Sequence, residues 1–338
     1  MTASRGVVSR VWRAWVDLFS AREPAFGWGV FRIGVGFCLL YSMTSISSAG
    51  LLDLLWVDVA YGGYERTDPV KILLIDLGPA TPSLVNAIFS VTFVGALGVF
   101  VGIGGRPITF LTLQGYICLT NINRTTVGSD DSLLTNALWL LFLCDATRTL
   151  SLRSRLREGR WNPPAEVGAW ARYLAIFQLV VVYTFAGLNK TNTHWVPWGD
   201  LNGLYRVWMD PVWLRFDMDW VAYVYPFTQL GSAVTWLFET FSFLMLAVYY
   251  CRYTRDRPGR VRAAFNRWDL RKLFLAVGAS LHMGIFLTMD VGPFSLISLT
   301  FYVCLFEPTE VEATFQRFFG RLRRTPRVST LEPTPALD

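Results

Sequence analysis

Long apolar runs that carry almost no charge recur along this chain, and they constrain its fold more than any other feature. A helix needs about 20 predominantly apolar residues to cross a bilayer, and runs near that length repeat between residues 26 and 306. The chain of 338 residues is 53% hydrophobic, with a mean hydropathy of +0.36. Little room is left for a separate soluble domain. We therefore predict an all-α fold, a polytopic integral membrane bundle in contact with the lipid bilayer.

The apolar runs divide into about eight candidate spans. They cover residues 26–48, 84–104, 107–121, 132–145, 169–189, 225–250, 272–290 and 293–306. The third, fourth and eighth are short for a full crossing. The sixth is long, so we expect it to be tilted or preceded by an interfacial turn.

Basic residues are distributed unequally between the loops. If the N-terminus is cytoplasmic, the inner segments hold most arginines, including the dense groups at 148–160 and 252–272. The outer segments then hold only Arg66, Lys71, Arg124, Lys190, Arg206 and Arg215. This positive-inside asymmetry predicts an even number of spans with both termini cytoplasmic, in the cell membrane. It also accounts for the net charge of +6 without nucleic-acid binding.

Three regions follow from these patterns. Residues 1–24 form a cytoplasmic leader in which 7–20 read as an amphipathic interfacial helix. Residues 25–308 form the transmembrane domain, and 309–338 form a basic, partly disordered cytoplasmic tail. No small-residue cleavage site follows the first span, so we expect it to act as its own insertion signal.

Classical metal and nucleophile motifs are missing from the sequence. The five cysteines lie within or beside apolar runs and form no CxxC, so we interpret them as packing residues. No phosphate loop, HExxH or GxSxG is present. We predict no metal site.

The segment QLVVVYTFAGLNKTNTHW, from Gln178 to Trp195, carries the strongest functional signal. An apolar run ends there on a single lysine, Lys190. A lysine that is partly desolvated at the mouth of a span can become a neutral amine and act as a base. Lysines at span ends more often extend to the interface and only anchor the helix. Both interpretations stay open.

Several polar residues lie inside the predicted spans, where ionisable groups are costly unless they are paired. Arg32 and Glu239 are candidates for an intramembrane ion pair, either functional or merely locking two helices. His282 is a candidate pocket residue or a helix–helix hydrogen-bonding group, and Gln178 lies within the fifth span.

Two adjacent carboxylates, Asp130 and Asp131, precede the fourth span in GSDDS. They can cap that helix, or line an outward-facing pocket with Lys190. The outer segments 49–83 and 190–224 are long, and rich in acidic and aromatic residues respectively. Longer loops of this kind suggest an extracytoplasmic functional face.

These segments together resemble the horizontally transferred transmembrane domain (HTTM) family, whose best-known member is vitamin K-dependent gamma-carboxylase. The resemblance covers most of the chain, from FRIGVGF through VGALGVFVGIGGR to HMGIFLTMDVGPFSLISLTFYVCLF. Its most specific positions are Gln178, Tyr183, Ala186, Gly187, Lys190 and Trp195.

The resemblance implies that Lys190 is a base acting on a reduced quinone, such as vitamin K hydroquinone or menaquinol. Asp130, Asp131, Gln178, Tyr183, Trp195 and His282 are then pocket candidates. Asn189 stands where the carboxylases have a second lysine, and the aspartates stand where they have a histidine. The chain also stops soon after the last span, without the large lumenal domain of the carboxylases. Carboxylation of glutamate is therefore not expected.

A shorter branch of the same family, the sporulation-delaying protein B group, is similar in length and keeps the lysine and the later tryptophan. Its members are needed for the maturation of a secreted toxin peptide. Two functions follow from the resemblance. One is a membrane enzyme with a lysine base that acts on a quinol, a secreted peptide or both. The other is a non-catalytic accessory factor for maturation of, or immunity to, a secreted peptide or small protein.

Overall fold

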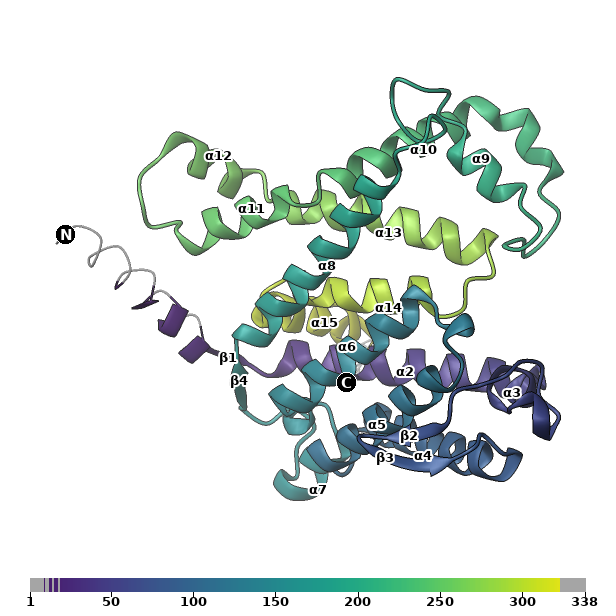
Figure 1. Ribbon diagram of the computed structural model, residues 1–338. Coiled ribbons are helices and arrows are strands. Elements are labelled where there is room, and N and C mark those ends of the chain that lie inside the picture. Colours follow the sequence, from purple (N-terminus) through teal and green to yellow (C-terminus); the bar gives the residue numbers. More distant parts are fainter. Residues whose placement is uncertain (1–8, 10–11, 14, 18, 323–338) are drawn as a thin grey trace, which may run out of the picture.

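The protein is helical almost throughout (Figure 1), as predicted. The structure, a computed structural model, describes residues 9, 12, 13, 15–17 and 19–322, with side chains up to residue 318. The helices are α2 (Phe26–Ser48), α3 (Leu52–Trp56), α4 (Pro82–Val101), α5 (Arg106–Ile122), α6 (Ser129–Cys144), α7 (Leu152–Glu158), α8 (Trp170–Asn189), α9 (Gly203–Trp208), α10 (Tyr225–Thr240), α11 (Leu244–Tyr253), α12 (Arg260–Arg267), α13 (Leu270–Thr288), α14 (Phe294–Phe301) and α15 (Pro308–Leu322). The predicted interfacial helix at 7–20 and the tail beyond 322 lie partly or wholly outside the described residues.

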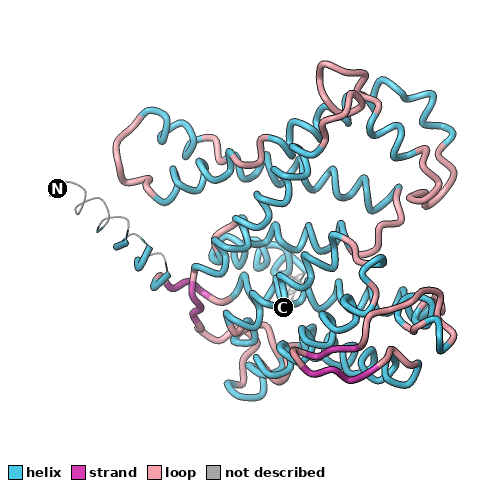
Figure 2. The backbone as a smooth tube through the Cα atoms, in the orientation of Figure 1, coloured by secondary structure: helices cyan, strands magenta, loops and turns pink. Residues whose placement is uncertain are grey.

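Two short antiparallel ribbons interrupt the helices (Figure 2). Strand β1 (Arg22–Pro24) pairs with β4 (Glu166–Gly168), with Glu23 opposite Val167. Strand β2 (Val70–Ile72) pairs with β3 (Ile75–Gly78). The first ribbon ties the segment before α2 to the segment before α8, so it fixes where these two helices begin.

Four described helices, α2, α4, α8 and α13, are long and apolar enough to cross a membrane. Two further spans are reached if each of two bent helix pairs counts as one. Helices α5 and α6 coincide with the third and fourth predicted spans but have only 17 and 16 residues. The structure thus supports a multi-pass membrane protein, and the count of eight stays a prediction.

The helices pack in two groups (Figure 1). Helices α2, α4, α5 and α6 pack in sequence order, and α14 lies against α2 and α6. Helix α8 packs on α10, which in turn contacts α13. The first group surrounds a core of fully buried side chains that includes Phe31, Leu39, Leu134 and Phe301.

The sixth predicted span, 225–250, is two helices and not one. Helix α10 ends at Thr240, α11 begins at Leu244, and the segments meet at 50°. At the joint, the Ser242 hydroxyl donates to the Phe238 carbonyl at 2.6 Å. Such bonding back to residue i−4 bends helices. The bend leaves Glu239 at the end of a broken helix, not in the middle of a continuous one.

The predicted Arg32–Glu239 ion pair does not form. The guanidinium of Arg32 donates to the carbonyls of Val99 and Phe100, at 2.5 and 2.6 Å, and to Leu150 at 2.6 Å. The first two are C-terminal carbonyls of α4, which lack partners within the helix and carry partial negative charge. Arg32 therefore holds the C-terminal end of α4, while Glu239 has a different partner.

Candidate functional site

Lys190 and Glu239 form an ion pair between α8 and α10. The Nζ atom of Lys190 lies 2.5 Å from Oε2 of Glu239, and the two side chains are 22% and 10% exposed. The ring of Trp195 covers the ammonium, with its centroid 5.2 Å from Nζ. The pair is therefore shielded from bulk water on several sides but keeps some access to it.

A close helix contact sets this geometry. Lys190 caps the C-terminal end of α8, and Gly187, one turn earlier, packs against the backbone of Thr240. A Cβ atom at Gly187 would lie 2.3 Å from the Thr240 nitrogen. Because Gly187 has no side chain, the end of α8 comes close enough to α10 for Lys190 to reach Glu239.

Substituting Gly187 with alanine is expected to destabilise the protein by about 1–3 kcal/mol, because backbone atoms must move to admit the methyl group. It should also weaken the Lys190–Glu239 contact. The matched control is Gly284→Ala in α13, where an added Cβ meets no atom within 4 Å. Thermal unfolding in detergent measures the stability of both variants. Equal melting temperatures for the two variants would show that α8 and α10 do not pack this closely.

Broken helices are a recurring feature of membrane proteins that bind substrates or ions near the bilayer midplane. Here Glu239 lies in the last turn of α10, just before the joint with α11. Thr240 Oγ1 and, on α8, Thr184 Oγ1 are buried and have no hydrogen-bond partner in the part of the chain that the structure describes. Buried polar atoms normally have partners, so these two hydroxyls add unused hydrogen-bonding capacity to the helices that carry the ion pair.

Two candidate pocket residues, Tyr183 and His282, are placed deeper, together with Tyr302. Tyr183 of α8 hydrogen bonds His282 Nε2 of α13 at 2.5 Å and the hydroxyl of Tyr302 at 2.6 Å. All three side chains are buried, and Gly278 makes room for the Tyr302 hydroxyl. His282 thus hydrogen bonds across helices here, and its Nδ1 has no hydrogen-bond partner among the described residues. Gln178 lies 12 positions before Lys190, about 18 Å along α8.

Asp130 and Asp131 line a separate cavity of about 230 Å³. Asp131 accepts from the Tyr116 hydroxyl at 2.5 Å and from the Gly128 amide at 2.7 Å. The second contact confirms the predicted cap at the start of α6, the helix of the fourth predicted span. Lys190 does not line this cavity, so the prediction that these carboxylates share a pocket with Lys190 is wrong. They belong to the first helix group, whereas Lys190 lies where α8 meets α10.

Asp130 gives a prediction for pH dependence. It precedes the predicted fourth span, and partial burial, together with the charge of Asp131, raises its pKa from 3.8 to about 6. Between these values the unfolded chain loses its proton before the folded protein does, so stability falls as pH rises through this window. We expect the melting temperature of wild type to fall relative to Asp130→Asn over that range. Asp256→Asn, on an exposed loop, serves as the control and should follow wild type.

An apolar groove of about 380 Å³ opens beside the joint between α10 and α11. Its lining includes the aromatic rings of Phe238, Phe241 and Phe274, with Ser242 as a polar group. Size and polarity fit an apolar ring with an aliphatic tail. Phe238 is the neighbour of Glu239 in the chain, and its ring packs on Tyr183 at 5.1 Å. The groove thus lies next to the ion pair, although neither charged residue lines it.

The sequence did not single out Tyr302 or the pairing of Glu239 with Lys190. Tyr302 is one aromatic among many in an apolar run, and only the contact with Tyr183 distinguishes it.

Within the described residues, no group of three or more histidine, cysteine or acidic side chains is placed to hold a metal ion.

Comparison with known proteins adds one match. The model of the HTTM domain family matches residues 22–254, which run from β1 to the end of α11 and contain Arg32, the Asp130–Asp131 pair, Lys190 and Glu239. No solved structure matches the chain.

Proposed function

The chain belongs to the HTTM family, and on that premise we propose that it is a membrane enzyme in which Lys190 acts as a base at the extracytoplasmic face of the cell membrane. The observation that carries the proposal is the partly buried Lys190–Glu239 pair, held beside the joint of a broken helix. General bases in enzymes are commonly groups whose protonation is controlled by burial and by a charged neighbour.

Proton transfer within the ion pair can produce the neutral amine that acts as the base. Transfer of one proton from the Lys190 ammonium to the Glu239 carboxylate turns an ion pair into two neutral groups. In general, a charge that is removed from water loses solvation, and this is why such a transfer can occur in a shielded site. The free amine of Lys190 can then accept a proton from a bound hydroxyl and hold it at Nζ. Glu239 must first release the proton it received to water, through its exposed part, and its carboxylate can then pair with the Lys190 ammonium again.

The ligand that we propose is a reduced quinone of the vitamin K or menaquinol type. When bound, it would supply an acidic hydroxyl and two reducing electrons. The apolar groove at the α10–α11 joint would hold its ring or tail, with Phe238 and Phe241 as aromatic walls. Trp195 would limit the access of water to Lys190 from the outer side.

We also infer eight crossings with both termini cytoplasmic. Support comes from the arginine-rich segments 148–160 and 252–272, and from α5, which packs on both α4 and α6. Fusing reporters of cytoplasmic and extracytoplasmic location after α4, α5 and α6 tests this topology. Alternating signals are expected, and the same signal after α5 and α6 would contradict it.

An epoxidation assay on purified protein tests the enzymatic proposal. Reduced vitamin K or menaquinol is supplied with oxygen, and wild type is compared with Lys190→Ala. Lys272→Ala is the matched control, because Lys272 is 76% exposed and its Nζ lies only as near as 3.9 Å to the carboxylate of Asp269. Epoxide is expected from wild type and from the control but not from Lys190→Ala. Equal product from all three proteins would remove Lys190 from the chemistry.

A second candidate function has its own supporting observation. Lys190 is already paired with Glu239 and covered by Trp195, which is also what a purely structural ion pair requires. In that case the protein would be an accessory factor for maturation of, or immunity to, a secreted peptide. Absence of epoxide from well-folded wild type would favour this function, and binding of a peptide to the outer face would then be sought.

A further inference from the structure

A large cavity lies at the opposite end of α8 from Lys190. Its volume is about 840 Å³, and it is formed by the β1–β4 ribbon, the segment 145–148 and α7. The ribbon precedes the first residue of α8, whereas Lys190 follows its last, so about 30 Å of helix separates the two sites. The cavity therefore belongs to the arginine-rich side of the protein and not to the site of Lys190.

Four arginines line this cavity, and two of them have no partner. Arg153 is held by Asp145 at 3.0 Å and by Thr147 at 2.8 Å, and Arg148 lies 3.5 Å from Asp145. The side chains of Arg22 and Arg157 make no hydrogen bond or ion pair within the part of the chain that the structure describes. The acidic residue Asp145 is thus already occupied, and the positive charge left free is that of two exposed guanidinium groups.

Two further carboxylates, Glu158 and Glu166, also line the cavity. Both belong to exposed residues, and neither makes an ion pair within the described residues. They limit the net charge of the cavity, so the case for an anion rests on the two free guanidinium groups and on their location.

The location of the cavity relative to lipid follows from the helical residues just before β1. Trp12, Trp15, Val16 and Phe19 are large apolar side chains that are between 47% and 69% exposed. Arg22 follows this stretch directly and lines the cavity. Exposed aromatic residues on a short helix next to a span are typical of the membrane interface. Arg22 therefore sits at the level of the lipid headgroups.

We propose that this cavity binds the phosphate of an anionic lipid headgroup, in the leaflet on the side of the N-terminal helix, through Arg22 and Arg157. Guanidinium groups bind phosphate oxygens in a bidentate manner, and basic pockets beside transmembrane helices bind anionic headgroups. A volume of about 840 Å³ is sufficient for a headgroup and its glycerol.

Lipid binding to purified full-length protein tests the proposal directly. Native mass spectrometry in detergent would count bound phosphatidylglycerol, with phosphatidylcholine as the zwitterionic comparison. The site variant is Arg22→Ala/Arg157→Ala. The matched control is Arg260→Ala/Arg267→Ala, which removes two exposed arginines of α12 that form no ion pair within the described residues. Melting temperatures in phosphatidylcholine should be the same for all three proteins, because all four positions are exposed.

The site variant is expected to bind phosphatidylglycerol about thirtyfold more weakly than wild type, because it loses two surface contacts between arginine and the headgroup. The control should bind like wild type, and phosphatidylcholine should bind weakly to all. The proposal is overturned if the site variant retains wild-type affinity, or if the two lipids bind wild type equally. Saturation by inorganic phosphate alone, at the affinity of the lipid, would assign the cavity to a free anion instead.

Discussion

Replacing Lys190 with arginine is expected to lower quinol-dependent turnover by about 10²–10⁴-fold, although the positive charge is kept. Arginine cannot lose its proton in a protein, so it cannot act as a base. It can still reach a carboxylate, and the contact with Glu239 should survive. The measurement is the rate of epoxide formation by purified variant and wild type under identical conditions.

The same substitution separates the two candidate functions. A structural lysine needs only its charge, so Lys190→Arg should then be nearly neutral in any assay of peptide maturation or immunity. Lys272→Arg controls for the general effect of adding a guanidinium. Loss of turnover with an unchanged melting temperature supports the base. Full turnover by Lys190→Arg would refute it, since no neutral amine is left at this position.

Much of the helical architecture could be predicted from the sequence, because bilayer-length apolar runs leave few alternatives. Helices α2, α8 and α13 begin and end within a few residues of the predicted spans. The break in 225–250 was not predicted, because hydropathy does not register it. The bend depends on Ser242 bonding back to Phe238, and Phe241 and Phe243 are as apolar as the residues of a continuous helix.

Lys190, Tyr183 and Trp195 could be selected from the sequence because a lone lysine at the end of an apolar run is unusual. The residues with which they interact could not be identified in this way. Arg32 and Glu239 were predicted to pair because both are ionisable and lie inside spans. A buried arginine can equally be satisfied by backbone carbonyls, and Arg32 is. Which acceptor a cation meets depends on which helix ends lie nearby, and that is a property of the packing.

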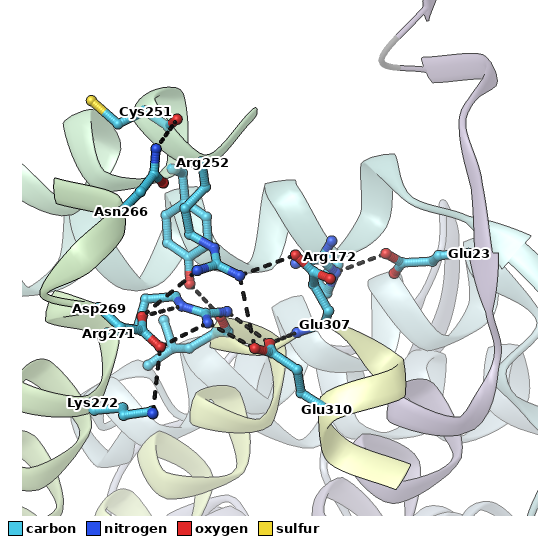
Figure 3. Close-up of polar contacts among 12 residues, drawn as sticks. Glu23, Arg172, Cys251, Arg252, Asn266, Asp269, Arg271, Lys272, Glu307 and Glu310 are labelled. Atoms are coloured by element: carbon cyan, nitrogen blue, oxygen red, sulfur yellow. Dashed lines mark hydrogen bonds and ion pairs between the residues drawn. The ribbon is translucent and has the colours of Figure 1, made fainter. Parts of the chain in front are cut away.

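The end of α11 and the first turns of α13 and α15 provide a second case (Figure 3). Sequence reading places Arg271 among the loop charges of 252–272. In the structure its side chain is 1% exposed, and it donates to both oxygens of Asp269 and to both oxygens of Glu310, at 2.7–3.0 Å. Arg252 adds a contact to Glu307 at 3.2 Å. These contacts hold α15 after the chain turns by 112° between Phe294–Leu305 and Pro308–Phe318.

Replacing Arg271 with methionine is expected to destabilise the protein by about 2–4 kcal/mol, the largest loss of stability that we predict. Removing one partner of a buried ionic cluster leaves the other charges without compensation. The value lies below that of a fully buried pair because Glu310 is 38% exposed and solvent screens it. Thermal or denaturant unfolding in a defined detergent measures the change.

Lys272→Met is the matched control for Arg271→Met, because it removes the same charge one position later from a side chain that is 76% exposed. Its effect should stay within about 0.5 kcal/mol. A double variant, Arg271→Met with Glu310→Gln, should regain part of the stability if stranded carboxylates cause the loss. If the control and Arg271→Met lose the same stability, the cluster does not hold α15. If Glu310→Gln restores nothing, the lost packing of the arginine on Phe306, whose ring lies 5.0 Å from the guanidinium, is the larger contribution.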